Sequence, residues 1–192
     1  MTKELDMRRT RAVNVAACLL AVALTSSGCQ TVRQAYGYVR GTNPSCTRTA
    51  EYTAEVHDRR SFVGGADNVF VGKVQASEGQ HVERKDLYSL FKVHVVTNLK
   101  GQLSGDVTVS QIGGNFNGTE CLQNNDEILS IGKTYLFTTV YSKNIDKHFV
   151  AASNYGDVEL SPDDVATLQS GTEPPIVLEF RDAVANQIPA KK

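Results

Sequence analysis

Five short segments rich in β-branched and aromatic residues follow one another along the chain, and they constrain the fold more than any other feature. They occupy residues 68–76, 87–98, 107–112, 133–141 and 147–153. Each is predicted to be a strand, because its apolar residues alternate with polar ones or form a short continuous run. No long helical pattern separates them, so about 85 residues hold five strands. This spacing predicts a mainly β domain, built as a small antiparallel barrel or sandwich.

Apolar side chains that recur along these strands form the predicted core. The candidates are Phe91, Val93, Val107, Leu136 and Phe137. Two longer polar segments interrupt the strands. Residues 77–86 predict a turn, and residues 113–132 predict a loop because they lack a periodic core pattern.

Helical signals flank the β-rich region on both sides. Residues 47–64 allow one or two turns of helix before a pair of glycines ends them. After the strands, residues 161–164 (SPDD) combine an N-cap, a proline in the first turn and acids that the helix dipole favours. Residues 176–187 carry apolar side chains at helical spacing, which predicts a helix packed on the barrel. Residues 161–192 are therefore predicted to form a short helical extension.

Residues 1–28 are predicted to be a signal segment. Basic residues precede an apolar stretch at 13–24, which is too short to span a hydrocarbon core of roughly 30 Å as a stable helix. The following TSSGCQ, which contains Cys29, resembles the lipobox of bacterial lipoproteins, although Ser26 stands where leucine is usual. The resemblance implies that Cys29 is acylated, with palmitate for example, and anchors the protein at the extracytoplasmic face of the cell membrane. The alternatives are ordinary secretion with a spare thiol and an uncleaved buried helix.

The cysteine count favours one pairing if the signal segment is removed and Cys29 carries lipid. Of the four cysteines, Cys46 and Cys121 then remain, and two thiols in an oxidising compartment most simply form a disulfide. Two separate buried thiols are the alternative. Residues 29–45 lack sustained periodicity and contain glycine and proline, so they are predicted to be a flexible tether from the membrane to the domain.

Composition and motifs argue against several functional classes. The 20 basic and 21 acidic residues give a net charge of −1, and the basic side chains are dispersed among acids, so we predict no nucleic-acid partner. The four histidines are widely spaced, which predicts no metal site, and no cofactor is expected. The sequence contains neither a nucleophile elbow nor a phosphate-binding loop, and no catalytic residue is predicted.

An ordered set of short motifs resembles a known family. The motifs are ADNVFVGKV at 66–74, LYSLFKVHVVTNLKG at 87–101, GDVTVSQIGGN at 105–115, the cysteine at 121, and IGKTYLFTTVY at 131–141. Together they are similar to bacterial domains related to tissue inhibitors of metalloproteinases (TIMP-like), which are netrin-like modules with an OB-fold barrel. The resemblance implies a five-stranded antiparallel OB-like barrel over residues 46–160, with Cys46 tied to Cys121.

One departure from the family bears on function. Animal inhibitors begin with a C-x-C motif whose first residue chelates the protease zinc, whereas Cys46 lies within NPSCT. Because a scaffold does not fix a function, we expect a non-enzymatic, lipid-anchored surface protein whose barrel binds an extracellular protein or glycan, through residues that the sequence does not indicate. The alternatives are a metalloprotease inhibitor acting through barrel loops and an envelope enzyme without a recognisable motif.

Overall fold

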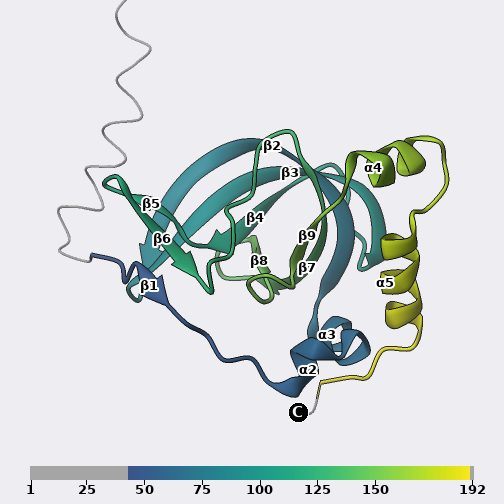
Figure 1. Cartoon of the computed structure of the whole chain (residues 1–192), viewed down its shortest axis with the longest axis horizontal. Helices are drawn as coiled ribbons and strands as arrows, with labels where there is room; N and C mark the ends of the chain where they lie inside the picture. The colour runs from purple at the N-terminus through teal and green to yellow at the C-terminus, as the bar shows by residue number, and fades with distance from the viewer. Residues whose placement is uncertain (1–42, 191–192) are drawn as a thin grey trace, which may run out of the picture. The chain divides into compact units, whose positions relative to one another are not determined.

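A computed structural model describes residues 43–190 and shows a mainly β domain with short helices before and after the main strands (Figure 1). The strands are β1 (Thr47–Arg48), β2 (Asn68–Glu83), β3 (Asp86–Lys100), β4 (Asp106–Ile112), β5 (Gly114–Phe116), β6 (Thr119–Gln123), β7 (Thr134–Ser142), β8 (Lys147–Val150) and β9 (Asp157–Glu159). The helices are α2 (Ala54–His57), α3 (Arg59–Gly65), α4 (Pro162–Gln169) and α5 (Pro175–Ala185). The predicted signal segment 1–28, and the predicted tether as far as residue 42, lie outside the described residues.

Five strands close into a ring in the order β2-β3-β4-β8-β7, with β7 pairing back onto β2. Figure 1 shows β2 and β3 as long curved arcs of this ring. Neighbouring strands are antiparallel except β4 and β8, which are parallel, so the prediction of a fully antiparallel arrangement is wrong at this pairing. Parallel neighbours need a long crossover, and residues 113–146 supply it by forming β5, β6 and β7 before the chain returns as β8.

The ring encloses one of two hydrophobic clusters. Its buried members are Phe70, Val74, Phe91, Val93, Val109, Leu129, Tyr135 and Phe137. Phe70 and Phe137 are fully buried and stack with their ring centroids 5.2 Å apart. Of the five predicted core residues, Phe91, Val93, Leu136 and Phe137 are confirmed as buried, whereas Val107 is only partly buried and packs against this cluster.

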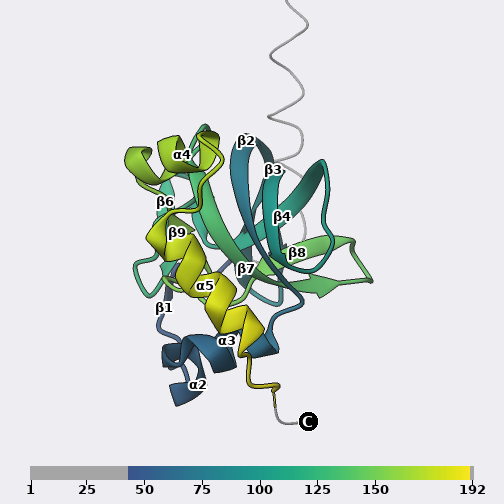
Figure 2. The same ribbon diagram turned by 90° about the vertical axis from the view of Figure 1, so that its right-hand side faces the viewer.

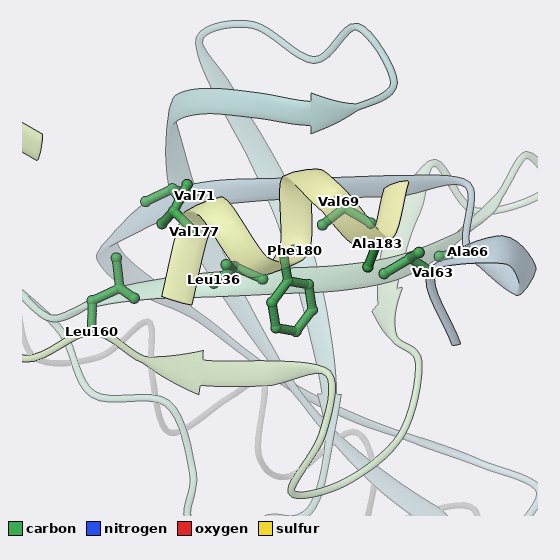
Figure 3. Close-up of a cluster of buried hydrophobic side chains, with 9 residues drawn as sticks. All are labelled: Val63, Ala66, Val69, Val71, Leu136, Leu160, Val177, Phe180 and Ala183. Atoms are coloured by element: carbon green, nitrogen blue, oxygen red, sulfur yellow. The ribbon is translucent and has the colours of Figure 1, made fainter. Parts of the chain in front are cut away.

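The second cluster lies outside the ring, where helices cover β2 and β7 (Figures 2 and 3). Val69, Val71 and Leu136 on the two strands pack with Val177, Phe180 and Ala183 on α5. Because the neighbouring residues of each strand fill the interior cluster, residues 68–72 of β2 and 134–139 of β7 are buried on both faces, and β-branched and aromatic residues predominate in them. The helix predicted at 176–187 is present as α5, but it ends earlier, at Ala185.

Polar contacts fix the ends of two helices. At the start of α4, the Ser161 hydroxyl accepts a hydrogen bond from the Asp164 main-chain N–H, and the Asp164 carboxylate accepts one from the Ser161 N–H. At the end of α3, the Val63 carbonyl accepts from the Ala66 N–H at 3.3 Å and also from Lys100 Nζ at 2.7 Å. Because Lys100 belongs to β3, this bond ties α3 to the ring.

The polar segment 77–86 is mostly strand rather than turn. β2 continues to Glu83, and the turn is reduced to Arg84 and Lys85, whose φ angles are 50° and 73°. Several register shifts against β3 occur along β2, and such bulges let a strand bend while it remains paired. The side chains of residues 77–80 are exposed, so this part of the strand has no core pattern to reveal it.

The predicted loop 113–132 also contains regular structure. Residues 114–123 form the β5–β6 hairpin, whose turn residues Asn117 and Gly118 have φ angles of 52° and 83°. β1 pairs with β6 in a separate three-stranded sheet, so these strands lie outside the ring. Short strands outside the main core need no alternating apolar pattern, which is why the sequence analysis missed them.

Candidate functional site

A groove of about 450 Å³ opens where three parts of the chain meet: the β2–β3 hairpin, the β5–β6 hairpin and the segment between β6 and β7. Its polar lining consists of Ser77, Gln80, Ser89, Asn115, Glu120 and Ser130. Its apolar side chains are Phe91, Ile128, Leu129 and Ile131. Phe91 and Leu129 are each 4% exposed and Ile131 is 62% exposed, so the apolar surface extends from the ring interior to the rim.

The lining limits the kind of ligand that fits. Its polar side chains are amides and hydroxyls, with Glu120 as the single charged group among them. Ligand sites commonly combine an apolar surface with a few placed hydrogen-bonding groups. The groove therefore suits a ligand with apolar faces and several neutral hydrogen-bonding groups, a description that fits a peptide segment or a glycan.

The Gln80 side chain bridges the β2–β3 hairpin to β5. In the orientation that satisfies both of its atoms, the amide donates to the Asn115 carbonyl at 2.8 Å and accepts from the Asn115 N–H at 3.0 Å. Ser89 Oγ donates to the Gly113 carbonyl at 2.8 Å and adds a second link. A Cβ on Gly114 would lie 2.0 Å from the Gln80 amide, so this close approach requires glycine.

Residues 124–131, which we call the groove wall, are held by Gln111, a fully buried residue of β4. Gln111 Oε1 accepts from the Leu129 N–H at 2.9 Å, and Nε2 donates to the Glu127 carbonyl at 2.9 Å. Nε2 also donates to Asp157 Oδ2 on β9 at 2.7 Å. These contacts join the groove wall to the ring and to β9. They act together with bonds from the Asn154 side chain to the Asn124 carbonyl and from the Ser130 N–H to the Tyr135 hydroxyl.

Two carboxyl groups with raised pKa values meet at Gln111: Asp126 belongs to the groove wall and Asp157 to β9. Burial raises the pKa of Asp126, which is 6% exposed, although hydrogen bonds from Asn154, Gln111 and Ser153 oppose the shift. Burial, followed by the charge of Asp126, raises the pKa of Asp157 to about 7. Neither aspartate lines the groove.

The predicted disulfide is present: Cys46 and Cys121 are bonded, with Cα atoms 3.8 Å apart. Around it, β1 pairs in parallel with β6, and the Ser45 N–H donates to the Lys85 carbonyl at 2.9 Å. Cys121 directly follows Glu120, which lines the groove. The bridge therefore fixes both the incoming chain and one side of the groove.

The remaining residues that the sequence analysis considered lie elsewhere. Cys29, the predicted lipidation site, is outside the described residues. His148 is buried, with Nδ1 3.3 Å from Asn68 Nδ2, and burial lowers its pKa. His94 Nδ1 lies 2.8 Å from Asp106 Oδ1 on an exposed surface. Within residues 43–190, no group of three histidine, cysteine or acidic side chains is placed to hold a metal ion.

No helix within the described part of the chain combines the length and the apolar character needed to cross a membrane. A comparison with models of known protein families finds no match to the chain. A search of curated proteins likewise finds no match.

The groove could not be found from the sequence because most of its residues lie in segments predicted as a turn and a loop, Ser89 and Phe91 on a predicted strand being the exceptions. One overlooked signal is the Asn117-Gly118 pair, since Asn-Gly between two β-compatible segments is a strong hairpin indicator. Recognising it would have placed Asn115 opposite Glu120, as the structure does. No local pattern predicts the contact between Gln80 and Asn115, which joins segments separated by β3 and β4.

Proposed function

We propose that this protein is a non-enzymatic, lipid-anchored binding protein at the extracytoplasmic surface of the membrane, and that its groove holds part of an extracellular protein or glycan. The groove carries the proposal. It offers about 450 Å³ lined by neutral hydrogen-bonding groups and apolar side chains, and buried hydrogen bonds position two of its sides. A site fixed before the ligand arrives loses less entropy on binding.

We infer further that the ring is an OB-like barrel of the netrin-like kind. Its strand order supports this description: β2, β3 and β4 form a meander, β7 pairs back with β2, and β8 inserts between β4 and β7. OB-folds are five-stranded, partly open Greek-key barrels that bind oligomeric ligands through strand faces and loops. This inference concerns the scaffold, and the binding proposal rests on the groove.

The anchoring part of the proposal rests on the sequence around Cys29. The Cys46–Cys121 disulfide supports it, because such bonds persist in oxidising compartments. With Cys29 acylated, residues 43–190 would lie outside the membrane and present the groove to extracellular ligands.

A non-enzymatic role is supported by the position of the shifted acids. Catalytic acids and bases work within hydrogen-bond reach of the substrate. Asp126 belongs to the groove wall and Asp157 to β9, but both accept hydrogen bonds from the buried Gln111 and neither lines the groove. Their raised pKa values are therefore better explained by structural burial than by a catalytic role.

One observation favours a second function, inhibition of a metalloprotease through barrel loops. The bond from the Ser45 N–H to the Lys85 carbonyl holds the disulfide-linked incoming chain beside the β2–β3 turn. An ion pair between Arg48 and Asp86 adds a second link between these segments. Two fixed loops side by side could enter a protease cleft. Saturable inhibition in a panel of zinc proteases would support this function, and the binding role predicts none.

The proposed groove is tested by blocking it. The full chain is displayed in its own cell envelope, and bound material is captured with Ser77→Trp, Lys73→Trp and unaltered protein. Both substituted side chains are exposed on β2, but only Ser77 lines the groove. We expect Ser77→Trp to lose at least tenfold in captured ligand and Lys73→Trp to keep it. Equal capture by both variants would reject the groove as the binding site.

A further inference from the structure

The buried side-chain amide of Gln111 has fewer N–H hydrogens than there are acceptor oxygens within its reach. Its Nε2 carries two hydrogens, but three oxygens lie within hydrogen-bond distance: Asp157 Oδ2 at 2.7 Å, the Glu127 carbonyl at 2.9 Å and Asp126 Oδ2 at 3.5 Å. The two shorter contacts use both hydrogens. The two carboxyl groups therefore meet at this amide with one donor too few, unless one of them carries a proton.

The surroundings assign that proton to Asp157. Asp126 receives further hydrogen bonds from the Asn154 main chain and the Ser153 side chain, which suit an ionised carboxylate. For Asp157, Gln111 is the only side chain among the described residues that donates a hydrogen bond to the carboxyl group. A proton on Asp157 leaves a single negative charge, that of Asp126, at the Gln111 amide.

The elements packed around the pair offer little opposite charge. The groove wall contributes the carboxylates of Asp126 and Glu127, β4 contributes the neutral Gln111, and the turn before β9 contributes neutral Ser153 and Asn154. On β7, Phe137 is the partner of Asp157 in the strand pairing. Lys133 pairs with Glu159 at the other end of β9 on the exposed surface.

We propose that a proton held by Asp157 against Asp126 keeps the groove wall in place, and that loss of this proton loosens residues 124–131 and so regulates binding in the groove. The regulation of binding rests on the function proposed above, whereas the loosening of the wall does not. Deprotonation puts two negative charges at one buried amide. The wall then relieves the repulsion by moving Asp126 and Leu129, which share Gln111, away from β9.

The sign and size of the effect follow from the pKa of Asp157, which rises from 3.8 to about 7 in the folded protein. Opening of the wall exposes the carboxyl group to water and returns its pKa to the ordinary value. The equilibrium constant for opening of the wall therefore increases as the pH rises from 3.8 to about 7. Between pH 5.5 and pH 8.5 the expected increase is about 30-fold.

Hydrogen–deuterium exchange of the full chain, without ligand, tests the loosening directly. After correction for intrinsic exchange rates, we expect protection of residues 124–131 to be about 30-fold lower at pH 8.5 than at pH 5.5. Asp157→Asn keeps an acceptor for Gln111 but cannot ionise, so its wall should be equally protected at both pH values. Glu127→Gln removes a neighbouring exposed carboxylate and should respond to pH as the unaltered protein does.

Two results would overturn the proposal: no change in wall protection with pH in the unaltered protein, or the same change in Asp157→Asn. If Asp157→Asn fails to fold, Asp126→Asn tests the same pair: it removes the second charge and should make the pH response clearly smaller, while burial of Asp157 keeps the rest of it. An undiminished response in Asp126→Asn would overturn the role given to Asp126. Because the exchange experiment needs no ligand, its failure rejects the pH switch alone. Loss of ligand capture through Ser77→Trp tests the binding function separately.

Discussion

Removing the Cys46–Cys121 bridge should loosen one side of the groove and the incoming chain together. The bridge closes a loop with a sequence separation of 75 residues. In the chain-entropy model, a loop of this length stabilises the folded state by about 4.5 kcal/mol at 25 °C. We expect the free energy of unfolding of the Cys46→Ala/Cys121→Ala variant to fall by about that amount, since alanine fills most of the buried space at Cys121.

The structure also indicates where the effect is confined. Without the bridge, β1 is held to β6 by a two-residue pairing and by the Asn124 side chain, whose hydrogen bonds to the Ala50 main chain measure 2.9 and 3.1 Å. The interior cluster of the ring contains neither cysteine. Residues 43–60 and 113–132 should therefore become mobile together, while the five ring strands keep their protection.

The assay pairs urea unfolding, followed by far-ultraviolet circular dichroism without reductant, with hydrogen exchange resolved by segment. The bridge variant and its parent both carry Cys29→Ala, so that neither is acylated and the two proteins differ only in the bridge. A loss below 1 kcal/mol, or exchange that rises equally in the ring strands, would refute the reasoning. The first result would mean that the bridge does not restrain the unfolded chain, and the second that the ring depends on it.

Three further predictions concern stability, and urea unfolding measures each of them. The raised pKa of Asp157 adds stability that is complete below pH 3.8 and is lost as the pH rises through about 7. The free energy of unfolding should therefore fall by about 2 kcal/mol between pH 5.5 and pH 8.5. Asp157→Asn should abolish this fall. A fall of the same size in Asp157→Asn would contradict the assignment of the proton to Asp157. Leu136→Ala, at a fully buried site, should cost about 2–5 kcal/mol, and Val107→Ala, at a partly buried site, should cost clearly less; equal losses would contradict the two-cluster description. Lys100→Met removes the charged donor of the Val63 carbonyl, which keeps only the longer bond from the Ala66 N–H at 3.3 Å, and it should cost about 1–3 kcal/mol. An equal loss in Lys73→Met, at an exposed position of β2, would show that no specific contact is involved.

The ring was largely predictable because its strands carry the apolar residues that fill the two clusters. Phe91 and Val93 are each followed by an exposed residue, and the first six residues of β7 are all buried because both of its faces are covered. These patterns depend only on local sequence and burial. The parallel β4–β8 pairing was not predictable in the same way. It joins only two pairs of residues, Val109 with His148 and Ser110 with Phe149, and it depends on how the crossover at 113–146 returns to the ring.

The groove was not predictable from local patterns because its contacts are long-range and polar. Gln80 reaches Asn115, and Gln111 reaches Leu129 and Asp157. Gln80, Gln111, Asn115 and Asp157 are of types common on protein surfaces, and Leu129 contributes only its main-chain N–H, so their roles appear only when the fold brings the partners together. The disulfide was predictable for the opposite reason: cysteine chemistry limits the possible partners to very few.

The most direct test of the account is a photocrosslink from the groove in intact cells. A benzophenone amino acid replaces Ile131 at the groove rim or, as a matched control, Leu178 on α5; the two side chains are 62% and 51% exposed. Benzophenone reacts with C–H bonds, so both protein and glycan ligands are captured. The account predicts a discrete adduct from position 131, found with the acylated membrane-bound protein and absent from position 178. The same adducts from both positions, or none from position 131, would contradict it.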